Sequence, residues 1–303
     1  MNRKQFIIAL AVLFVGGVAL IVTESIFKYF GDNGWLYDLL IISFGYLFIK
    51  YKLTAPWQMF TNKFSMMVDY DLDVAGAVQM AEKAVANAPT KQFKTLYQVY
   101  LGIALYNAGR YEDAIKNFNT IELKKVITGY QVLIFAYTSY ASFELDDMET
   151  VRQSIERIKN VKEKLGPKYA DFVDGYTELL DAMQNLSDDP EHYKEIIERH
   201  FSREDGYIST KLILNYRLAL YYKEIHDDLE MDKCLAFVIA NGKEHHTALR
   251  AKELFKGSVN VDDYIYVEPQ PGDVVDTQQG EPTEPELIEE KPEENEKPEN
   301  KEE

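Results

Sequence analysis

The sequence predicts an all-α protein with an N-terminal membrane module and an acidic C-terminal tail. Residues 1–57 contain two strongly apolar segments. Residues 58–257 carry apolar side chains at three- and four-residue spacing, without the alternation typical of strands. Residues 258–303 contain 16 acidic residues against three lysines, and six of the ten prolines. These three patterns predict two transmembrane helices, a helical-repeat domain and a disordered tail.

The first apolar segment, residues 6–23, contains no charged residue. A helix of 18 residues rises about 27 Å, close to the roughly 30 Å hydrocarbon core of a bilayer. Arg3 and Lys4 precede it, as in a signal peptide, but no small-residue cleavage site follows. We therefore expect an uncleaved membrane helix, with a signal peptide as the alternative.

The second apolar segment, about residues 34–50, has one internal charge, Asp38. Aromatic residues near both ends suit the two membrane interfaces: Trp35, Tyr37, Tyr46 and Tyr51. A buried soluble helix or a re-entrant segment is the alternative. Lysine and arginine flank the two spans on the side of the termini, with Lys28 alone in the connecting loop. This bias predicts a multi-pass protein of the cell membrane with both termini in the cytoplasm.

The middle region predicts successive helices joined by short turns, which must pack as antiparallel neighbours. Gly109, Pro89, Pro167 and Pro190 are among the residues that separate them. The expected ranges are 58–70, 72–88, 91–108, 111–124, 127–145, 147–165, 167–187, 190–201, 206–226, 228–241 and 244–256.

Residues 98–126 resemble a tetratricopeptide repeat (TPR), of the kind found in membrane-anchored bacterial proteins. The matching residues are Leu101, Gly102, Gly109, Tyr111, Ala114 and Phe118, whereas Gln98 and Leu105 replace the usual Trp and Tyr. The resemblance implies stacked helix–turn–helix pairs forming an α-solenoid. Small residues at Gly102 and Ala114 would let two helices approach closely. A generic irregular helical bundle is the alternative.

The same register recurs along the chain, with anchors at Val74, Tyr111 and Met148, a period of 37 residues. Ala77, Ala81 and Pro89 belong to the first copy, and Val151, Ile155 and Ile158 to the third. We expect a degenerate copy through Met231, Cys234 and Val238, with Cys234 as a small buried residue, and a weaker one through Tyr193, Ile196 and His200.

Catalytic motifs are absent from the sequence: it has no glycine-rich phosphate loop, HExxH, GxSxG or CxxC. The histidines, including the adjacent His245 and His246, are expected at the surface. The Asp146-Asp147, Asp188-Asp189 and Asp227-Asp228 pairs are expected to cap helices. We therefore expect no enzyme, metal site or cofactor, and no small-molecule substrate is evident. The net charge of −17 argues against a nucleic-acid partner.

The resemblance places the partner-binding groove of the array on specific first-helix positions. In the best copy these are Val99, Ile103, Tyr106 and Asn107. In the next copy they are Ala136, Tyr140, Phe143 and Glu144, and in the fourth the candidates are Tyr216, Ala219, Lys223 and His226. This groove lacks the basic residues with which such domains hold a terminal carboxylate, so an extended or helical apolar segment fits better. Alternatively, these residues pack against a neighbouring helix of a tightly wound array.

The combination predicts a scaffold or adaptor that binds another protein near the membrane. The alternative is an accessory or regulatory subunit of a membrane complex that acts through its transmembrane helices, and an enzyme with an unrecognised site is a third class. The tail is expected to be a solvated or partner-seeking acidic arm. Residues 261–267 are an apolar exception that could dock on the last helices or add a short strand elsewhere.

Overall fold

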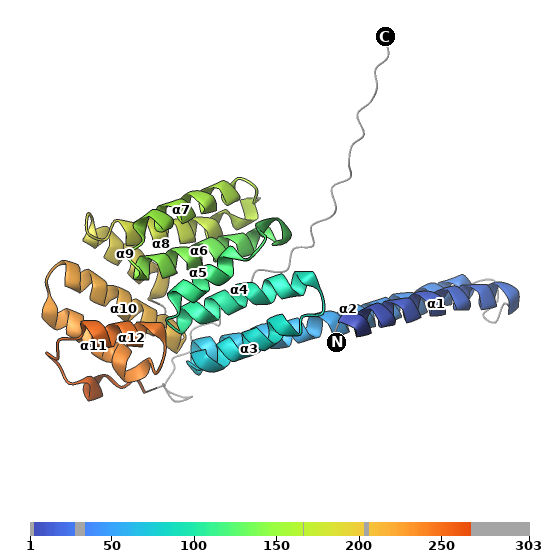
Figure 1. Ribbon diagram of the computed structural model, residues 1–303, viewed down its shortest axis with the longest axis horizontal. Helices are drawn as coiled ribbons and strands as arrows, with labels where there is room; N and C mark the ends of the chain where they lie inside the picture. Colours follow the sequence, from blue (N-terminus) through green and yellow to red (C-terminus); the bar gives the residue numbers. More distant parts are fainter. Residues whose placement is uncertain (1–2, 28–33, 166, 203–205, 268–303) are drawn as a thin grey trace, which may run out of the picture. The chain divides into compact units, whose positions relative to one another are not determined.

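The computed structural model describes residues 3–27, 34–165, 167–202 and 206–267, and every regular element within them is helical (Figure 1). The chain divides into one compact unit, Met1–Tyr266, and a second, Val267–Glu303. Only Val267 of the second unit is described, so the predicted disorder of residues 268–303 lies outside the described residues.

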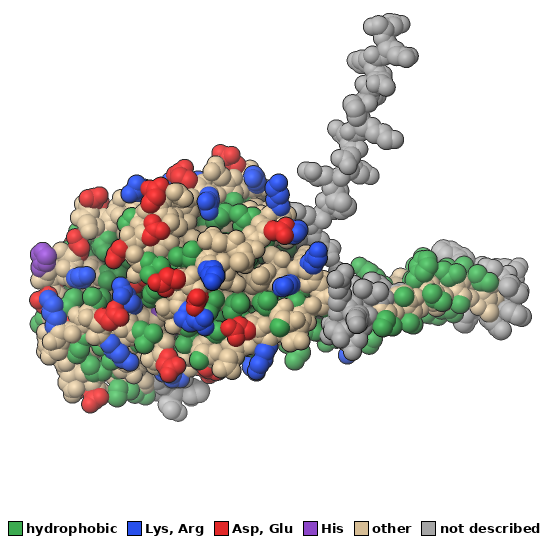
Figure 2. Space-filling model, in the orientation of Figure 1, with side chains coloured by type: hydrophobic (Ala, Val, Ile, Leu, Met, Phe, Trp, Pro, Cys, Tyr) green, Lys and Arg blue, Asp and Glu red, His purple; other side chains and the backbone are tan. Residues whose placement is uncertain are grey.

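Helix α1 (Arg3–Phe27) packs against the first part of α2 (Gly34–Ser65). We call α1 and the part of α2 before Pro56 the apolar hairpin. Gly45 makes the two helices approach closely, since a Cβ at this residue would lie 2.4 Å from the side chain of Leu13. Large apolar side chains of the hairpin, such as Phe14, Val15, Phe44 and Phe48, are exposed (Figure 2). Tested against the length and hydropathy that a bilayer requires, none of the described helices qualifies as a span, so the two predicted transmembrane helices are not confirmed.

Helix α2 continues beyond Pro56 without a break. The sequence instead predicted a span that ends near residue 50 and a separate helix that starts at residue 58. The second part buries Trp57, Phe60 and Phe64 against aromatic residues of α4, with the Phe60 and Tyr97 ring centroids 4.8 Å apart. A π-helical turn, η2 (Met66–Tyr70), ends this segment. The first helix of the domain is therefore a direct extension of the hairpin.

The remaining helices pack in chain order as sequential pairs, an arrangement consistent with a helical repeat. First helices of neighbouring pairs also touch, α4 against α6 and α6 against α8. The bounds are α3 (Val74–Ala86), α4 (Lys91–Asn107), α5 (Tyr111–Asn119), α6 (Thr128–Glu144), α7 (Met148–Lys162), α8 (Ala170–Gln184), α9 (Pro190–Phe201), α10 (Ile208–Glu224), α11 (Asp228–Asn241) and α12 (His246–Leu254), with short 3₁₀ turns at η3 (Leu123–Lys125), η4 (Pro167–Tyr169) and η5 (Val261–Tyr264).

The predicted register holds for three pairs, because Val74, Tyr111 and Met148 are the first residues of α3, α5 and α7. The predicted register of the degenerate copy was wrong by three residue positions. Helix α11 begins at Asp228, so Met231 stands where Ala77, Ala114 and Val151 stand in their helices, and it is buried like them. Cys234 is consequently only half-buried, and Leu235 takes the core position instead.

A common turn precedes four of the second helices. Leu72, Gly109, Asp146 and His226 all have positive φ, between 53° and 71°, and each is followed by the N-cap residue of the next helix. Asp147 and Asp227 accept hydrogen bonds from backbone N–H groups of Thr150 and Glu230 at 3.1 Å, which confirms the capping role. Asp189 caps α9 in the same way.

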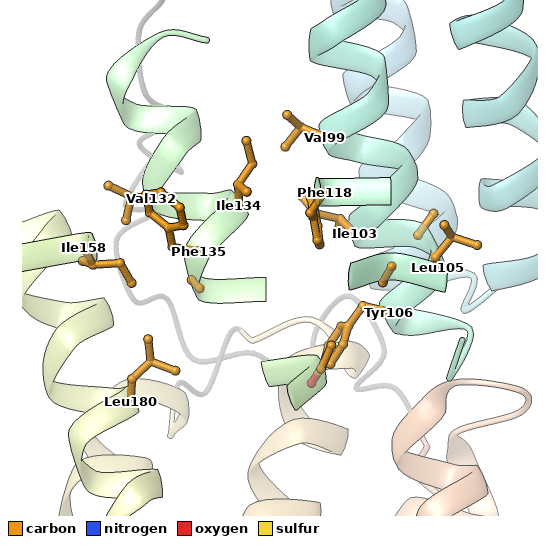
Figure 3. Packing of buried hydrophobic residues seen from close by; sticks show 14 of the residues in the cluster. Val99, Ile103, Leu105, Tyr106, Phe118, Val132, Ile134, Phe135, Ile158 and Leu180 are labelled. Atoms are coloured by element: carbon orange, nitrogen blue, oxygen red, sulfur yellow. The ribbon is translucent and has the colours of Figure 1, made fainter. Parts of the chain in front are cut away.

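The two helices of a pair approach each other closely at the small residues that the sequence predicted for these contacts. A Cβ on Gly102 would lie 2.3 Å from the Phe118 ring, and Ala114 is fully buried. Ala77 and Ala81 are also fully buried, Leu101 packs at the edge of the core, and Pro89 lies in the connection between α3 and α4. Figure 3 shows the core side chains of α6 between Ile103 and Phe118 on one side and Ile158 and Leu180 on the other.

The last helices return to the first pairs, so the array closes on itself. Helix α12 contacts α4, and α10 contacts η2, where the Ser209 hydroxyl donates to Asp69 at 3.2 Å. Residues after α12 dock on α11 through Asn241, whose side chain donates to the Tyr264 carbonyl and accepts from the Tyr266 N–H at 2.9 and 2.8 Å. Of the two alternatives for the apolar segment 261–267, docking on the last helices is the one observed, through Tyr264 and Tyr266. The compact unit therefore extends past residue 257, to Tyr266.

Candidate functional site

A cavity of about 400 Å³ lies among α4, α6, α8, α9, α10 and the start of α12. Seven aromatic side chains line it: Tyr106, Tyr137, Tyr140, Phe172, Tyr176, Phe201 and Tyr216. Its polar lining residues are Asn107, Asp171, His200, Arg217, His246 and Thr247. Mostly apolar walls with a few polar groups are typical of ligand sites, and the volume falls in their usual range.

The predicted groove residues divide between this cavity and the core. Tyr106, Asn107, Tyr140 and Tyr216 line the cavity. Val99 and Ile103 are buried among core side chains away from it, as the alternative of a tightly wound array predicted (Figure 3). Phe143 packs at the edge of the core, with the Arg217 guanidinium 5.2 Å from its ring centroid.

The aromatic wall is held by ring–ring contacts between helices far apart in the chain. The Tyr106 ring lies 4.4 Å from His246 of α12 and 5.4 Å from Tyr137 of α6, centroid to centroid. Burial raises the pKa of Tyr106 and Tyr140 well above the ordinary value and that of Tyr176 to about 12. The three hydroxyls therefore stay protonated at neutral pH and can act as hydrogen-bond donors.

A buried carboxylate contacts two of the cavity-lining residues, Tyr216 and Arg217. Glu144, at the end of α6, accepts a hydrogen bond from the Tyr216 hydroxyl at 2.8 Å. The same Oε2 lies 3.4 Å from Nε of Arg250, and Oε1 lies 3.7 Å from Nη1 of Arg217. Only 2% of the Glu144 side chain and 5% of the Arg217 side chain are exposed. Two guanidinium groups therefore share one buried carboxylate.

One nitrogen of the Arg217 guanidinium lacks a hydrogen-bond partner. Its Nη1 is buried and unpartnered among the described residues, as is Oε1 of Glu144, which lies 3.7 Å from it. Its position is set by the weak ion pair with Glu144 and by the rings of Phe143 and Tyr216. Arginine remains charged in proteins, so this donor-rich group faces the cavity as a cation.

His245 and His246 are fully buried, which corrects the surface location expected from the sequence. His245 contacts the Asn107 side-chain oxygen through Nε2 at 3.0 Å, and His246 contacts the Tyr111 hydroxyl through Nδ1 at 3.2 Å. Burial lowers the pKa of His245 to about 4. Burial, together with His245, Arg217 and Arg250, lowers the pKa of His246 well below its usual range. Both imidazoles are neutral at pH 7, and the Nε2 atom of His246 has no partner among the described residues.

Sequence reasoning placed Tyr106, Asn107 and Tyr140 near one another but missed Arg217 and His246. The sequence did contain an indication that Arg217 is buried, because it is the only charged residue in the largely apolar segment LILNYRLALYY. No comparable signal existed for His246, whose burial depends on the return of α12 to α4.

Neither the free cysteine nor the metal-ligating side chains of the described residues form a second candidate site. Burial raises the pKa of the Cys234 thiol to about 12, so this cysteine is protonated and a poor nucleophile at neutral pH. Within the residues that the structure describes, no group of three or more His, Cys, Asp or Glu side chains is placed to hold a metal ion. The cavity is therefore the candidate site.

Comparisons with known proteins identify no relative. No family model matches the chain, no curated protein matches it, and no solved structure matches its fold.

Proposed function

We propose that this protein is a membrane-tethered adaptor of the TPR type. In this proposal the apolar hairpin is embedded in the bilayer, and the helical array binds a partner protein on the cytoplasmic side. The partner's segment is expected to insert an apolar or aromatic side chain at the mouth of the aromatic cavity.

The observation that carries the proposal is the change of surroundings along α2. Before Pro56, large apolar side chains such as Phe44 and Phe48 are exposed, at 68% and 61%. After Pro56, Trp57, Phe60 and Phe64 are buried in the core of the helical array. A continuous apolar surface of this kind needs lipid or another apolar surface to cover it. A hairpin covered in this way would hold the attached array beside the membrane.

Aromatic residues support the choice of the cavity as the partner site. Interface energy concentrates in a few aromatic and arginine side chains that fill desolvated pockets. Tyr140 and Phe172 line the cavity and are half-buried, so an inserted side chain can reach them.

The test uses photo-crosslinking of the full-length chain in intact cells. A benzophenone amino acid replaces Phe172 in the cavity, Phe44 on the hairpin or the exposed Ile225 as a surface control. The adaptor predicts a discrete protein adduct from position 172 that is absent from position 225. Crosslinks from position 44 alone would refute the adaptor and leave the hairpin as the site of recognition.

An accessory subunit of a membrane complex is the second candidate, favoured by Asp38. This residue is 4% exposed within the hairpin, and its Oδ1 has no partner among the described residues. A buried carboxyl group in an apolar helix is costly and is usually retained for a specific contact. If the protein is an accessory subunit, Asp38→Asn should abolish the adduct from position 44. If it is an adaptor, the same substitution should leave the adduct from position 172 unchanged.

Membrane attachment is tested separately. The full-length chain should remain in the pellet after alkaline extraction of membranes, because removing charge interactions does not release an embedded hairpin. A reporter that is active only in the cytoplasm should work when it is fused after Val267. Release of the protein by alkali, or an inactive reporter on stable protein, contradicts this part of the proposal.

A further inference from the structure

The lining of the cavity includes a recognition group, Arg217, that the adaptor proposal does not use. We propose that Arg217 and the aromatic wall form a binding site for a small organic acid with one carboxylate and an apolar, preferably aromatic, body. This inference goes beyond the adaptor, because it concerns the interior of the cavity and holds whether or not a protein binds at its mouth.

The first argument concerns hydrogen bonds. Arg217 is 4% exposed, and its Nη1 has no hydrogen-bond partner among the described residues, since Oε1 of Glu144 lies 3.7 Å away, beyond hydrogen-bond distance. Buried polar groups are nearly always hydrogen-bonded, and an unpaired one costs about 1–3 kcal/mol, more when charged. A planar carboxylate accepts two parallel N–H bonds from a guanidinium, which makes it the best-matched acceptor.

The ion pairs of this region hold Arg217 less closely than Arg250. Arg217 and Arg250 share the carboxylate of Glu144, and Arg250 also pairs with the exposed Glu253 at 2.6 Å. Glu144 lies nearer to Arg250 than to Arg217, at 3.4 and 3.7 Å, so Arg217 is the less well neutralised of the two. The two histidines contribute no charge at pH 7.

The rest of the lining determines the body of the ligand. Tyr106, Tyr137, Tyr140, Phe172 and Tyr176 surround the cavity, and aromatic rings pack well against another ring. Asp171, on α8, is the acidic residue among those that line the cavity. A second carboxylate on the ligand would be placed among apolar rings or near Asp171, so a dicarboxylate is disfavoured.

Closure of the array favours a free acid over a chain terminus. The cavity is bounded on several sides, and α12 joins the first pairs through the contact between His246 and Tyr106. A small free acid can be enclosed in a cavity of about 400 Å³, which leaves no room for the residues that precede a chain terminus.

Gly175 offers a way to fill the cavity without disturbing the fold. It lies on α8, lines the cavity, and a Cβ added there would meet Cε1 of His200 at 3.4 Å, an ordinary contact distance. Replacing a glycine inside a helix also favours the helix. Gly175→Leu should therefore remain folded and occupy part of the ligand space, with Gly175→Ala as its matched control.

The experiment is calorimetric titration of the full-length protein in detergent with 3-phenylpropionate, its neutral amide, phenylsuccinate, and a peptide ending in a free carboxyl group. We expect saturable binding of the monoacid, at least tenfold weaker binding of the amide and the diacid, and none of the peptide. Gly175→Leu should abolish saturable binding, Gly175→Ala should retain it, and Arg217→Lys should weaken it at least tenfold because lysine cannot bond bidentately.

Circular dichroism and thermal unfolding establish whether each variant is folded. If Arg217→Lys unfolds, the Gly175 pair and the comparison of acid with amide still decide the matter. The proposal is overturned if wild type does not bind the acid, if the amide binds equally well, if Gly175→Leu binds as wild type does, or if only the peptide binds. A failed adaptor would leave these results unchanged, since no partner protein is present.

Discussion

The two parts of helix α2 contain similar residues and meet opposite surroundings. Phe44, before Pro56, is 68% exposed, whereas Phe60, after it, is 8% exposed. In the first part, apolar residues occur on all sides of the helix, so the single neighbour α1 cannot cover them. In the second part, Trp57, Phe60 and Phe64 recur on one face, and the helical array covers that face. Apolar composition alone therefore does not create a core; spacing and a matching surface do.

The sharpest test of this comparison uses two phenylalanines of the same helix. Phe60→Ala removes a ring that packs against Tyr97 and Tyr100 and should lower the free energy of unfolding by about 3–5 kcal/mol. Phe44→Ala should change it by less than about 0.5 kcal/mol, because exposed sites contribute little. Thermal unfolding of the full-length protein in detergent measures both. Equal effects would show that the two parts of α2 do not differ as described.

A second test concerns glycines inside the helical array. Gly102→Ala forces the Phe118 ring to move, and overpacking of this kind costs about 1–3 kcal/mol. Gly129 lies near the start of α6 with open space around it, so Gly129→Ala should leave stability unchanged or raise it by less than about 1 kcal/mol. The same unfolding measurement applies. A stabilising Gly102→Ala would contradict the register of the α4–α5 pair.

Acid should loosen the array through its buried histidines. The pKa of His245 is about 4 in the folded chain and about 6.5 when unfolded, so folding favours the neutral form. Above pH 6.5 this difference has no effect on stability. As the pH falls below 6.5, the unfolded chain takes up the proton first, and stability falls until the pH reaches about 4. For His245 alone the loss between pH 7 and pH 5 is about 2 kcal/mol.

The histidine prediction is checked by unfolding at pH 7, 6 and 5. His245→Gln should reduce the pH dependence relative to wild type, whereas His192→Gln, at an exposed position of α9, should not. An unchanged pH dependence in His245→Gln would mean that this residue does not titrate as its burial requires. The hairpin has no buried histidine in its described part, so this effect reports on the array alone.

The smallest expected effect is at the helix caps. Asp147→Ala removes the acceptor for the Thr150 N–H and should cost about 1 kcal/mol. The neighbouring Asp146 has a φ of 59°, and Asp146→Gly should be neutral or slightly stabilising because glycine adopts this conformation freely. Denaturant unfolding of both variants distinguishes capping from turn geometry. A destabilising Asp146→Gly would point to an additional role for the Asp146 side chain.

Much of the array was predictable because its determinants are local. The apolar spacing located each helix from α3 to α12 to within a few residues, and the anchors Val74, Tyr111 and Met148 coincided with helix starts. The aspartates that precede helices act on N–H groups only three residues away. The degenerate copy failed for a local reason too: Met231 was aligned as a helix start, although the cap at Asp227 marks that start.

The sequence by itself determined the helical class, the order of the pairs, the register of the first three and the apolar character of the hairpin, since these depend on side chains within one or two turns of each other. Only the tertiary structure decided the closure of the array and the cavity. The contacts that form it join Tyr216 to Glu144, Arg250 to Glu144, His246 to Tyr111 and His245 to Asn107, pairs separated by 72 to 138 positions. Burial of the histidines and of Arg217 follows from how the last helices pack on the first. That packing depends on the combined curvature of every pair, which no local pattern specifies.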